Sequence, residues 1–457
     1  MNNQSKKMAL LGSASISKAL LAMGIPTMIG MLVNAFYNLA DAYFVGGLGE
    51  GQMAAISVVY PLGQVVVGLG LLFGNGAASY ISRLLGRGDV ENADKVASTA
   101  LYSSIATGAI IILIAMVFLR PILKLLGATG GILPYAVTYA EIYIASCVFN
   151  VFNVTMNNLV TSEGAAKTTM CALLIGAALN IALDPLLIYV FGFGVAGAAI
   201  ATAISQAAST SVYLTYILRR KSVLHFRIQD CASSKEIVSE ILKIGVPTLV
   251  FQILTSLSIA LINNASGNYG DAAIAGMGVV TRLVSMGSLT VFGFIKGFQP
   301  IAGYSYGAGK FDRLREAIQI SILWSTVFCV IFGSILALFP GAIVSQFSIG
   351  DVEMIRIGAA SLRANGITIM LFGFYTVYSS LFLALGRGRE GFVLGACRQG
   401  ICFIPVILLL PMVWGLNGIM YAQPVADVLS AIITVFMAIP LHRELNDMRN
   451  HAAAIKS

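Results

Sequence analysis

The chain has 457 residues, of which 58% are hydrophobic and only 11% are charged. Soluble globular proteins carry about 25% charged residues, so this composition excludes a soluble enzyme, a secreted module and a disordered scaffold. The formal net charge of +8 does not favour nucleic-acid binding, because the Lys and Arg residues stand in short segments between apolar runs.

Twelve apolar segments are predicted to cross a membrane, since a spanning helix needs ~20 mostly apolar residues. The predicted fold class is therefore an all-α polytopic membrane protein. In the first half the spans are predicted at 19–46, 54–80, 96–119, 132–160, 168–191 and 195–218. In the second half they are predicted at 243–266, 272–301, 316–339, 356–384, 391–413 and 416–440. The polar N-terminus does not resemble a cleaved signal peptide.

Basic residues fall almost entirely on one side of this predicted topology. The side that holds the N-terminus, the even-numbered connections and the C-terminus carries 21 of the 28 Lys and Arg residues, from Lys6 to Lys456. The other side carries three, Arg120, Lys124 and Arg356. Because positively charged loops stay in the cytoplasm, we expect a multi-pass protein of the cell (inner) membrane with both termini cytoplasmic.

A shift of 221 residues superimposes the two halves of the sequence. It pairs Gly24-Ile25-Pro26-Thr27 with Gly245-Val246-Pro247-Thr248, and it makes eight of the 23 glycines in the first half coincide with glycines in the second. Two or three coincidences are expected by chance. The repeat predicts two parallel six-helix lobes, residues 1–220 and 243–457, joined by a cytoplasmic linker, 221–242, with a cargo cavity between the lobes.

Motifs for nucleotide or metal chemistry are missing from the sequence or stand in the wrong context. Gly307-Ala308-Gly309-Lys310 lacks the spacing and the Ser or Thr of a phosphate-binding loop. The G-x-G-x-x-G match at 192–197 falls in a turn between two spans with no preceding strand. The three histidines lie in the linker and the C-terminal tail. We expect neither an enzyme nor a cofactor.

Polar side chains inside the spans of the first half predict a cation site. A charge within the bilayer is costly, so each one is a functional candidate. At 1.5 Å per residue, Asp41 lies ~9 Å below the outer end of its span, and Asp184 and Thr202 lie ~12 Å deep. Asn180 stands one turn before Asp184 on the same helical face. These four oxygen-bearing side chains suit Na⁺, and one of the two carboxylates could equally hold a proton.

Five residues in or near this predicted site also have a purely structural explanation. Asp41 could be a satisfied polar residue near a helix end, and Asp184 could bond to the backbone that Pro185 frees. Pro26 predicts a kink that either moves during transport or is static. Tyr37 and Tyr139 could join the polar network or simply pack in the core.

In the second half, the deeply placed Asp427 is expected to pair with a basic side chain. Arg398 and Arg282 are the opposite charges available, so we predict a structural ion pair in this lobe, with a role in cargo binding or gating as the alternative. Lys296 and Arg363 are expected to reach the membrane surface from near the span ends.

Taken together, these motifs resemble the multidrug and toxic compound extrusion (MATE) family of cation-coupled antiporters. The resemblance extends over the twelve spans and rests on a set of segments: the Gly-x-Pro pair, Tyr37-Asn38-Leu39-Ala40-Asp41, Arg83-Leu84-Leu85-Gly86-Arg87-Gly88-Asp89, Glu163-Gly164, Leu179-Asn180-Ile181-Ala182-Leu183-Asp184-Pro185 and Gly194-Val195-Ala196-Gly197-Ala198-Ala199. It implies a cation site in the first lobe at the positions named above, with Pro26, Tyr37 and Tyr139 in the associated network. Ile262 stands at the repeat position of Asp41, which argues against a second-lobe cation site.

The resemblance implies a secondary active multidrug efflux transporter that exchanges H⁺ or Na⁺ for amphipathic, often cationic organic compounds by alternating access. The alternative is a flippase or exporter of a lipid-linked or endogenous amphipathic metabolite, which Arg282 and Arg398 would serve by holding an anionic head group. A channel or a membrane-bound enzyme is not favoured. The expected partners are small amphipathic cargo and membrane lipids, without nucleic acid, and the expected state is a monomer.

Overall fold

The computed structural model describes residues 3–128, 130–231, 234–347 and 351–454. Lys456 and the outermost residues of the two predicted lobes lie outside these ranges. Within the described residues all regular structure is helical, and twelve helical segments are long and apolar enough to cross a membrane. The chain is an all-α, multi-pass membrane protein, as its sequence predicts.

The spanning helices follow the predicted segments closely. Those of the first half are α2 (Ile16–Gly46), α3 (Glu50–Arg87), α4 (Val90–Val117), α6 (Leu133–Ser162), α7 (Ala166–Pro185) with the π-helical turn η1 (Leu186–Val190), and α8 (Gly194–Leu218). Those of the second half are α9 (Lys235–Gly267), α10 (Asp271–Gly307), α11 (Phe311–Leu338), α13 (Val352–Thr368) leading through η3 (Ile369–Leu371) into α14 (Phe372–Ala384), α15 (Gly388–Ala396) leading through the π-helical turn η4 (Cys397–Ile401) into α16 (Phe403–Trp414), and α17 (Leu416–Ala454).

Helices extend beyond the apolar segments at several places. The predicted linker, 221–242, is shortened because α9 already begins at Lys235, and the described residues of its remainder include the short turn η2 (Ile228–Asp230). The last span was expected to end at residue 440, but α17 continues to Ala454. Short helices α1 (Asn3–Gly12), α5 (Leu119–Leu125) and α12 (Pro340–Ser345) add to the predicted set. Hydropathy marks only the apolar core of a span, whereas backbone hydrogen bonding continues into the polar residues at its ends.

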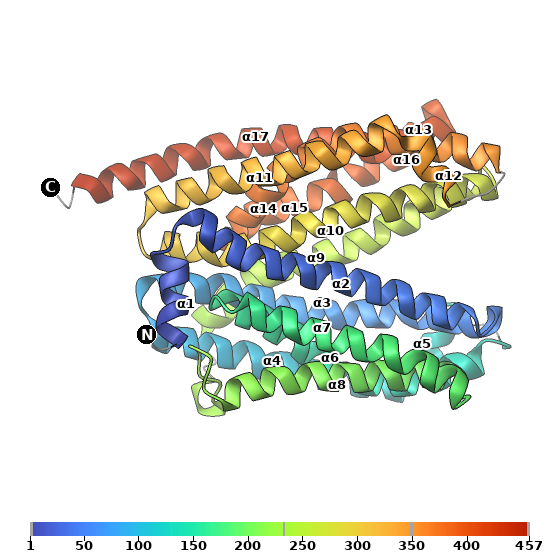
Figure 1. The fold of residues 1–457 in the computed structure, drawn as a ribbon, viewed down its shortest axis with the longest axis horizontal. Helices are drawn as coiled ribbons and strands as arrows, with labels where there is room; N and C mark the ends of the chain where they lie inside the picture. The colour runs from blue at the N-terminus through green and yellow to red at the C-terminus, as the bar shows by residue number, and fades with distance from the viewer. Residues whose placement is uncertain (1–2, 129, 232–233, 348–350, 455–457) are drawn as a thin grey trace.

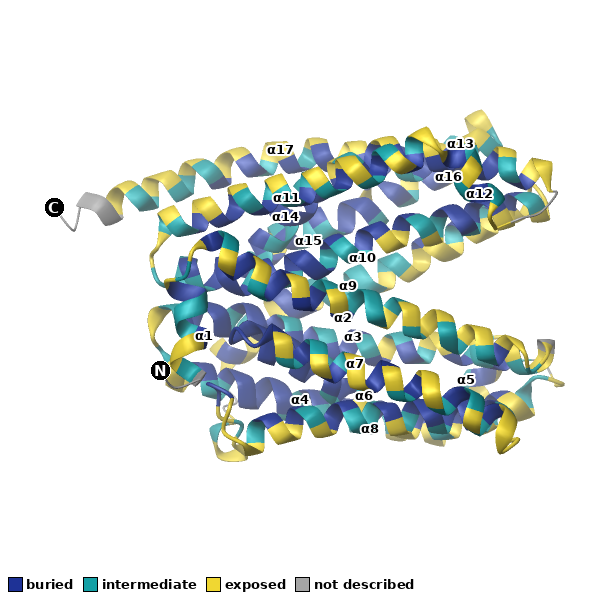
Figure 2. Ribbon diagram, viewed as in Figure 1, coloured by how far each residue is buried: buried dark blue, intermediate teal, exposed yellow. Residues whose placement is uncertain are grey.

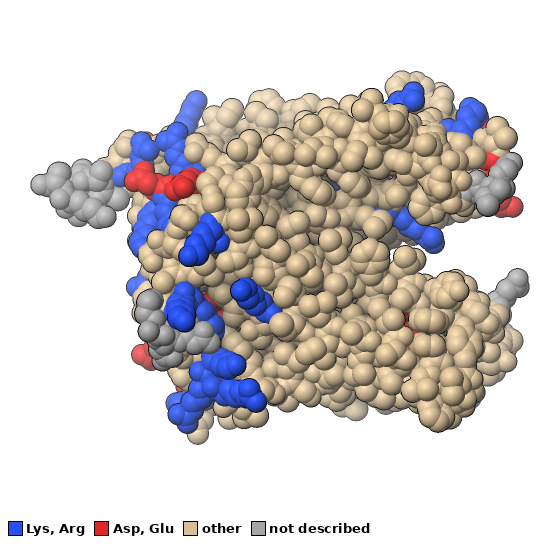
Figure 3. Space-filling model, viewed as in Figure 1, with Lys and Arg blue, Asp and Glu red and all other residues tan. Residues whose placement is uncertain are grey.

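The two halves of the chain form two lobes that meet at one end and diverge at the other (Figure 1). Both described termini lie at the end where the lobes meet, which we call the termini end. Lys and Arg side chains gather at this end of the visible face, and a deep cleft opens between the lobes at the opposite end (Figure 3). The cavity between the lobes therefore opens away from the basic surface.

Glycines of the internal repeat let the lobes approach at the termini end. A Cβ atom at Gly76 would lie 2.2 Å from the carbonyl oxygen of Ile241, and one at its repeat partner Gly297 would lie 2.5 Å from the amide nitrogen of Gly24. Glycine is needed where backbones come this close, because any side chain would separate the helices. Gly86 and Gly307 form the same kind of contact across the lobes.

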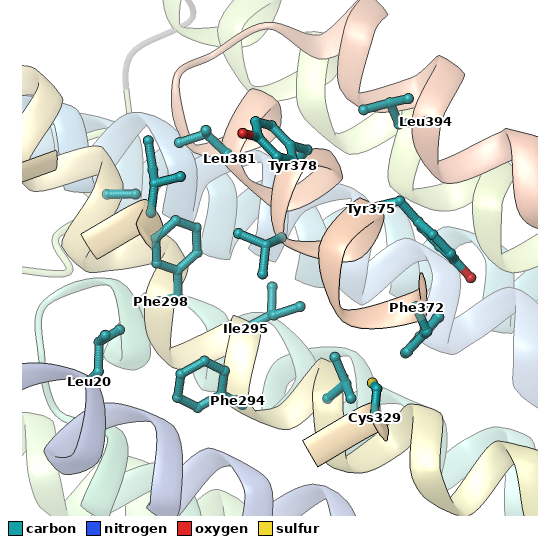
Figure 4. Packing of buried hydrophobic residues seen from close by; sticks show 14 of the residues in the cluster. Leu20, Phe294, Ile295, Phe298, Cys329, Phe372, Tyr375, Tyr378, Leu381 and Leu394 are labelled. Atoms are coloured by element: carbon teal, nitrogen blue, oxygen red, sulfur yellow. The ribbon is translucent and has the colours of Figure 1, made fainter. Parts of the chain in front are cut away.

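The beginning of α2 packs into the core of the second lobe. Leu20 is fully buried and belongs to the same apolar cluster as Phe294 and Phe298 of α10 and Leu381 of α14. Figure 4 shows Leu20 facing the Phe294 and Phe298 side chains across the lobe boundary. Buried residues concentrate on the inward faces of the helices, while the outward faces are largely exposed (Figure 2). The exposed apolar surface is that of a protein embedded in lipid.

Helix α1 connects the two lobes across the termini end. Its Lys7 amine forms an ion pair of 3.1 Å with the fully buried Glu163, which follows α6 of the first lobe. At the other end of α1, the Lys310 amine donates to the carbonyl of Gly12 (2.7 Å), and the Arg313 guanidinium donates to the carbonyl of Leu11. Positive side chains are favoured at a helix C-terminus, so α1 is held by both lobes at once.

Candidate cation site and central cavity

Three helices of the first lobe supply the predicted cation ligands. Asp41 comes from α2, Asn180 and Asp184 from α7, and Thr202 from α8. Small residues bring these helices together: a Cβ atom at Gly30 of α2 would lie 2.8 Å from Leu173 of α7. This close packing holds the polar side chains of all three helices within one lobe.

The structure gathers the four predicted ligands in one cluster, in which Asn180, Asp184 and Thr202 are buried and Asp41 is half-buried. The Asn180 amide donates to Asp184 Oδ1 at 3.4 Å, and the carboxyl groups of Asp41 and Asp184 lie within electrostatic range of each other. The hydroxyl of Tyr37 interacts with Thr202 and lies within electrostatic range of both carboxyl groups. Asn180 and Asp184 are 0% exposed to solvent.

Two oxygen atoms of this cluster have no hydrogen-bond partner among the residues that the structure describes. Asn180 Oδ1 and Asp184 Oδ2 are both buried and unsatisfied. A buried polar atom without a partner is destabilising by about 1–3 kcal/mol, and such atoms mark sites that an ion, a proton or a water molecule completes. Hard oxygen atoms of this kind are suitable ligands for Na⁺, and a carboxylate can also take a proton.

The carboxylates of this cluster lack positive partners within the part of the chain that the structure describes. None of the ion pairs found there includes Asp41 or Asp184. The described residues also contain no group of three or more His, Cys, Asp or Glu side chains that could hold a metal ion. With two carboxylates and two neutral oxygen donors, the cluster suits a monovalent cation better than a tightly bound divalent metal.

Proline shapes both helices that carry the carboxylates. Pro185 closes α7 directly after Asp184, and the π-helical turn η1 follows it. Within the described residues, the hydrogen bond found for the Asp184 carboxylate comes from Asn180 and none comes from the freed backbone. Pro26 lies inside α2, buried near the lobe contact and ~22 Å along the helix from Asp41.

Tyr139 lies at the inner wall of the cluster. It is 6% exposed and stacks on Tyr143 with ring centroids 5.4 Å apart. It lies within electrostatic range of Asp41. Tyr139 therefore packs in the core of the first lobe within electrostatic range of Asp41, whereas Tyr37 is half-buried and lies within electrostatic range of both carboxyl groups.

In the second lobe the structure joins two of the three residues of the predicted ion pair. Arg398 Nε lies 3.0 Å from Asp427 Oδ1, and both side chains are buried. Tyr375 and Gln423 donate to the same carboxylate oxygen, at 3.3 and 2.9 Å. Arg282 does not belong to the pair, since its side chain is exposed on α10 and the described residues give it no acidic partner.

A cavity of about 580 Å³ lies beside this ion pair, at the boundary of the two lobes. Its volume falls in the range of small-molecule sites, ~300–1,000 Å³. Most of its wall comes from the second lobe, with α2, α3 and α6 of the first lobe closing one side. The wall combines aromatic side chains with amides and hydroxyls: Phe251, Phe292, Phe392, Gln252, Thr255 and Gln399.

Lys296 is a cavity residue that the sequence reasoning missed. It was expected to extend to the membrane surface, but it lies 11 residues (~16 Å) from the termini end of α10 and lines the cavity. Its amine donates across the lobe boundary to Asn157 Oδ1 of α6. The helical spacing that Lys296 shares with the lining residues Ser285, Ser288 and Phe292 could have indicated this orientation.

Comparison with known proteins agrees with this architecture. The MatE family model matches residues 26–186 and 247–409. The chain is 31% identical to the multidrug export protein MepA of Staphylococcus aureus (strain MRSA252), over 94% of this chain and 95% of that protein. It is also similar to a solved outward-facing multidrug resistance MATE transporter of the MOP superfamily, at 26% identity with a TM-score of 0.90 over 97% of this chain and 99% of that one.

Another solved structure, of a MATE protein in the bent conformation, gives 26% identity and a TM-score of 0.90 over 98% of this chain and 99% of that one. The family model covers both halves of the internal repeat, and the likeness in sequence and in fold extends over nearly the whole chain. The chain therefore belongs to the MATE family of membrane transporters, which are not enzymes.

Proposed function

We propose that this MATE transporter is a secondary active multidrug efflux antiporter that exchanges H⁺ or Na⁺ for amphipathic organic compounds by alternating access. The observation that carries the proposal is the pair of unsatisfied buried oxygens, Asn180 Oδ1 and Asp184 Oδ2, beside the Asp41 carboxyl group. The name of the Staphylococcus aureus relative, a multidrug export protein, supports efflux of more than one compound.

In the proposed cycle the coupling cation enters from the open cleft and binds at Asp41 and Asp184, with Asn180 and Thr202 as further oxygen ligands. The cation removes the repulsion between the two neighbouring carboxylates, so the α2, α7 and α8 segments can draw together. Pro26 interrupts the hydrogen bonding of α2, which allows this helix to bend as Asp41 changes partners. A bend in α2 changes the wall of the central cavity, because Met31 of α2 lines it.

The membrane potential is sufficient to drive this exchange when the cargo carries no net charge. One charge that crosses 100 mV releases ~2.3 kcal/mol, which corresponds to a cargo gradient of roughly 50-fold per cation. The proposed orientation places both termini in the cytoplasm of the cell, or inner, membrane, in line with the Lys and Arg residues that gather at the termini end (Figure 3). In that orientation the cleft opens to the outside.

Efflux from liposomes tests the proposal directly. Purified protein is reconstituted with ethidium inside, and efflux is followed under an imposed Na⁺ gradient and then under an imposed pH gradient. We expect one gradient to drive efflux in the wild type, and Asp41→Asn to abolish it. Glu141→Gln is the matched control, because Glu141 is an exposed carboxylate of the same lobe. Full cation-driven efflux by Asp41→Asn would disprove the coupling site.

A further inference from the structure

The charge of the central cavity indicates what kind of cargo it holds. Among the described residues its wall contains two basic side chains, Lys296 and Arg398, and no Asp or Glu. Arg398 is neutralised by Asp427 behind the wall, at 3.0 Å. Lys296 has no carboxylate partner in any ion pair of the described residues, so the cavity carries one uncompensated positive charge.

The Lys296 amine also has hydrogen-bonding capacity to spare. An ammonium group has three N–H donors, and among the described residues one of them is used, in the bond to Asn157 Oδ1. Further along the same face of α10, the amide nitrogen of Gln299 is a buried donor without a partner, and on α14 the hydroxyl of Thr376 is likewise unsatisfied. These three side chains line the same cavity.

We infer that the central cavity binds amphipathic compounds that carry an anionic group, a carboxylate or a phosphate, and that Lys296 is the residue that recognises this group. The inference rests on the proposed efflux function and refines its substrate class. The expectation from sequence was a cargo that is often cationic, but a simple lipophilic cation would meet the uncompensated charge of Lys296 without an acidic residue to offset it. A zwitterion whose anionic end faces Lys296 would compensate the positive charge of the cavity.

The rest of the cavity suits the apolar part of such a compound. Phe251 and Phe292 meet edge to face, with ring centroids 6.2 Å apart, and Phe292 meets Phe372 in the same way at 5.4 Å. All three rings line the cavity. An apolar wall beside a single ammonium group lowers the local dielectric and strengthens the attraction between that ammonium and an anion.

A matched pair of dyes separates the anionic group from the rest of the ligand. Rhodamine B carries a free carboxylate, whereas its ethyl ester has the same ring system without the negative charge. Binding of each dye to the detergent-purified full chain is measured by fluorescence polarisation, in the absence of any gradient. We expect the wild type to prefer rhodamine B over the ester by about tenfold, the size typical of a hydrogen bond to a charged group.

Variants then assign the preference to one residue. Lys296→Gln should lose it, and Lys296→Arg, which keeps the positive charge, should retain most of it. The control is Arg363→Gln, which removes an exposed basic side chain of α13 that does not line the cavity. An unchanged preference in Lys296→Gln would overturn the inference. An equal loss of affinity for both dyes would also overturn it, because that result would mean that Lys296 acts only through its structural contact with Asn157.

The source of the anionic group is resolved by a parallel measurement with a fluorescent short-chain phosphatidic acid. Binding of this lipid that depends on Lys296 supports the inference with a lipid head group as the anion, and Lys296-dependent binding of rhodamine B alone supports it with a free amphipath. Gradient-driven efflux of rhodamine B and of its ethyl ester is recorded on the same protein preparations. Failure to export either dye would remove the antiport proposal, whereas lost selectivity between the dyes with intact efflux would remove only the present inference.

Discussion

The two lobes share one scaffold but carry opposite charges in their interiors. The first lobe holds two carboxyl groups, the half-buried Asp41 and the buried Asp184, without a positive partner among the described residues, and the second buries the Arg398–Asp427 pair with Lys296 beside it. Under the repeat, Ile262 replaces Asp41 and Pro405 replaces Asp184. Conversely, Asn75 stands in the first lobe where Lys296 stands in the second.

This contrast suggests a division of labour between the duplicated halves. The contacts that close the termini end are kept in both halves, since Gly76 and Gly297 make equivalent approaches to the other lobe. The buried charged side chains differ. The duplicated halves therefore share the contacts that join the lobes, while their interiors differ in the way that the proposed cation site and the proposed cargo site require.

The largest effect on stability is expected from breaking the ion pair of the second lobe. Asp427→Asn leaves the Arg398 guanidinium buried and unpaired, which should destabilise the protein by about 3–5 kcal/mol. Thermal unfolding in detergent would measure this as a lowered Tm. The double variant Arg398→Met with Asp427→Asn should recover most of the loss, because it removes the isolated charge.

The exposed pair Glu353–Arg356 provides the control for this measurement. Its two side chains are 55% and 66% exposed, so Glu353→Gln should leave the Tm almost unchanged. If Asp427→Asn had an equally small effect, the stability of the second lobe would not depend on its ion pair. The buried ion pair would then no longer distinguish the second lobe from the first.

The corresponding prediction for the first lobe concerns the cation that we propose to bind its two carboxyl groups. A cation that binds only the folded protein at 100 times its Kd stabilises it by about 2.7 kcal/mol. We therefore expect the Tm of the wild type to rise when NaCl replaces choline chloride, if Na⁺ is the coupling ion, or when the pH is lowered, if it is H⁺.

Asp184→Asn should abolish that rise, whereas Glu141→Gln should leave it intact. An ion-dependent rise that persists in Asp184→Asn would place the cation elsewhere in the protein. A rise in both salt and acid would mean that the site accepts either ion.

A third prediction tests the contact that the two halves share. Gly297→Ala places a Cβ atom 2.5 Å from the backbone of Gly24, which should cost about 1–3 kcal/mol through forced separation of α10 from α2. Gly278→Ala in the same helix is the control, because no atom lies within 4 Å of its added Cβ. A Tm equal for the two variants would show that the lobes do not need this close approach.

Much of the first-lobe site could be predicted from sequence because its residues obey simple helical rules. Asn180 and Asp184 are four residues apart on one helix, and depth alone places Asp41 and Thr202 at the same level. The ion pair was only partly predictable. Opposite charge at similar depth selects Arg398 for Asp427, but it also suggests Arg282, whose side chain is exposed.

What the sequence could not supply is the relation between the lobes. Whether Lys296 extends to the membrane surface or lines a cavity depends on Asn157 of the opposite lobe, and no local pattern identifies that neighbour. Helix α1 was missed for the same reason. Its segment is polar and short, and it is held by tertiary contacts such as that between Lys7 and Glu163 rather than by an apolar periodicity.

The smallest effect on stability is expected at the start of α4, where the first half has a helix cap and the second half has a contact with α1 at the equivalent position. Asp89 precedes α4, and its carboxylate accepts a hydrogen bond of 3.1 Å from the Asn92 backbone amide; its repeat partner Lys310 makes no such cap and instead donates to Gly12 of α1. Asp89→Ala should therefore cost about 0.5–2 kcal/mol, and Asp89→Asn much less.

This cap should also depend on pH. Hydrogen bonds from the Asn92 side chain and backbone lower the pKa of Asp89, which lies outside the spanning segments. A lowered pKa in the folded state means that the carboxylate stabilises the protein at neutral pH and that this contribution fades as the pH falls through the acidic range. The difference in Tm between wild type and Asp89→Ala should thus shrink towards low pH, whereas the difference between wild type and Lys310→Ala should not, because the contact of Lys310 with Gly12 includes no carboxylate. A constant difference for Asp89→Ala would mean that the neutral side chain caps α4 as well as the ionised one, and that the two halves differ here in the anchor alone.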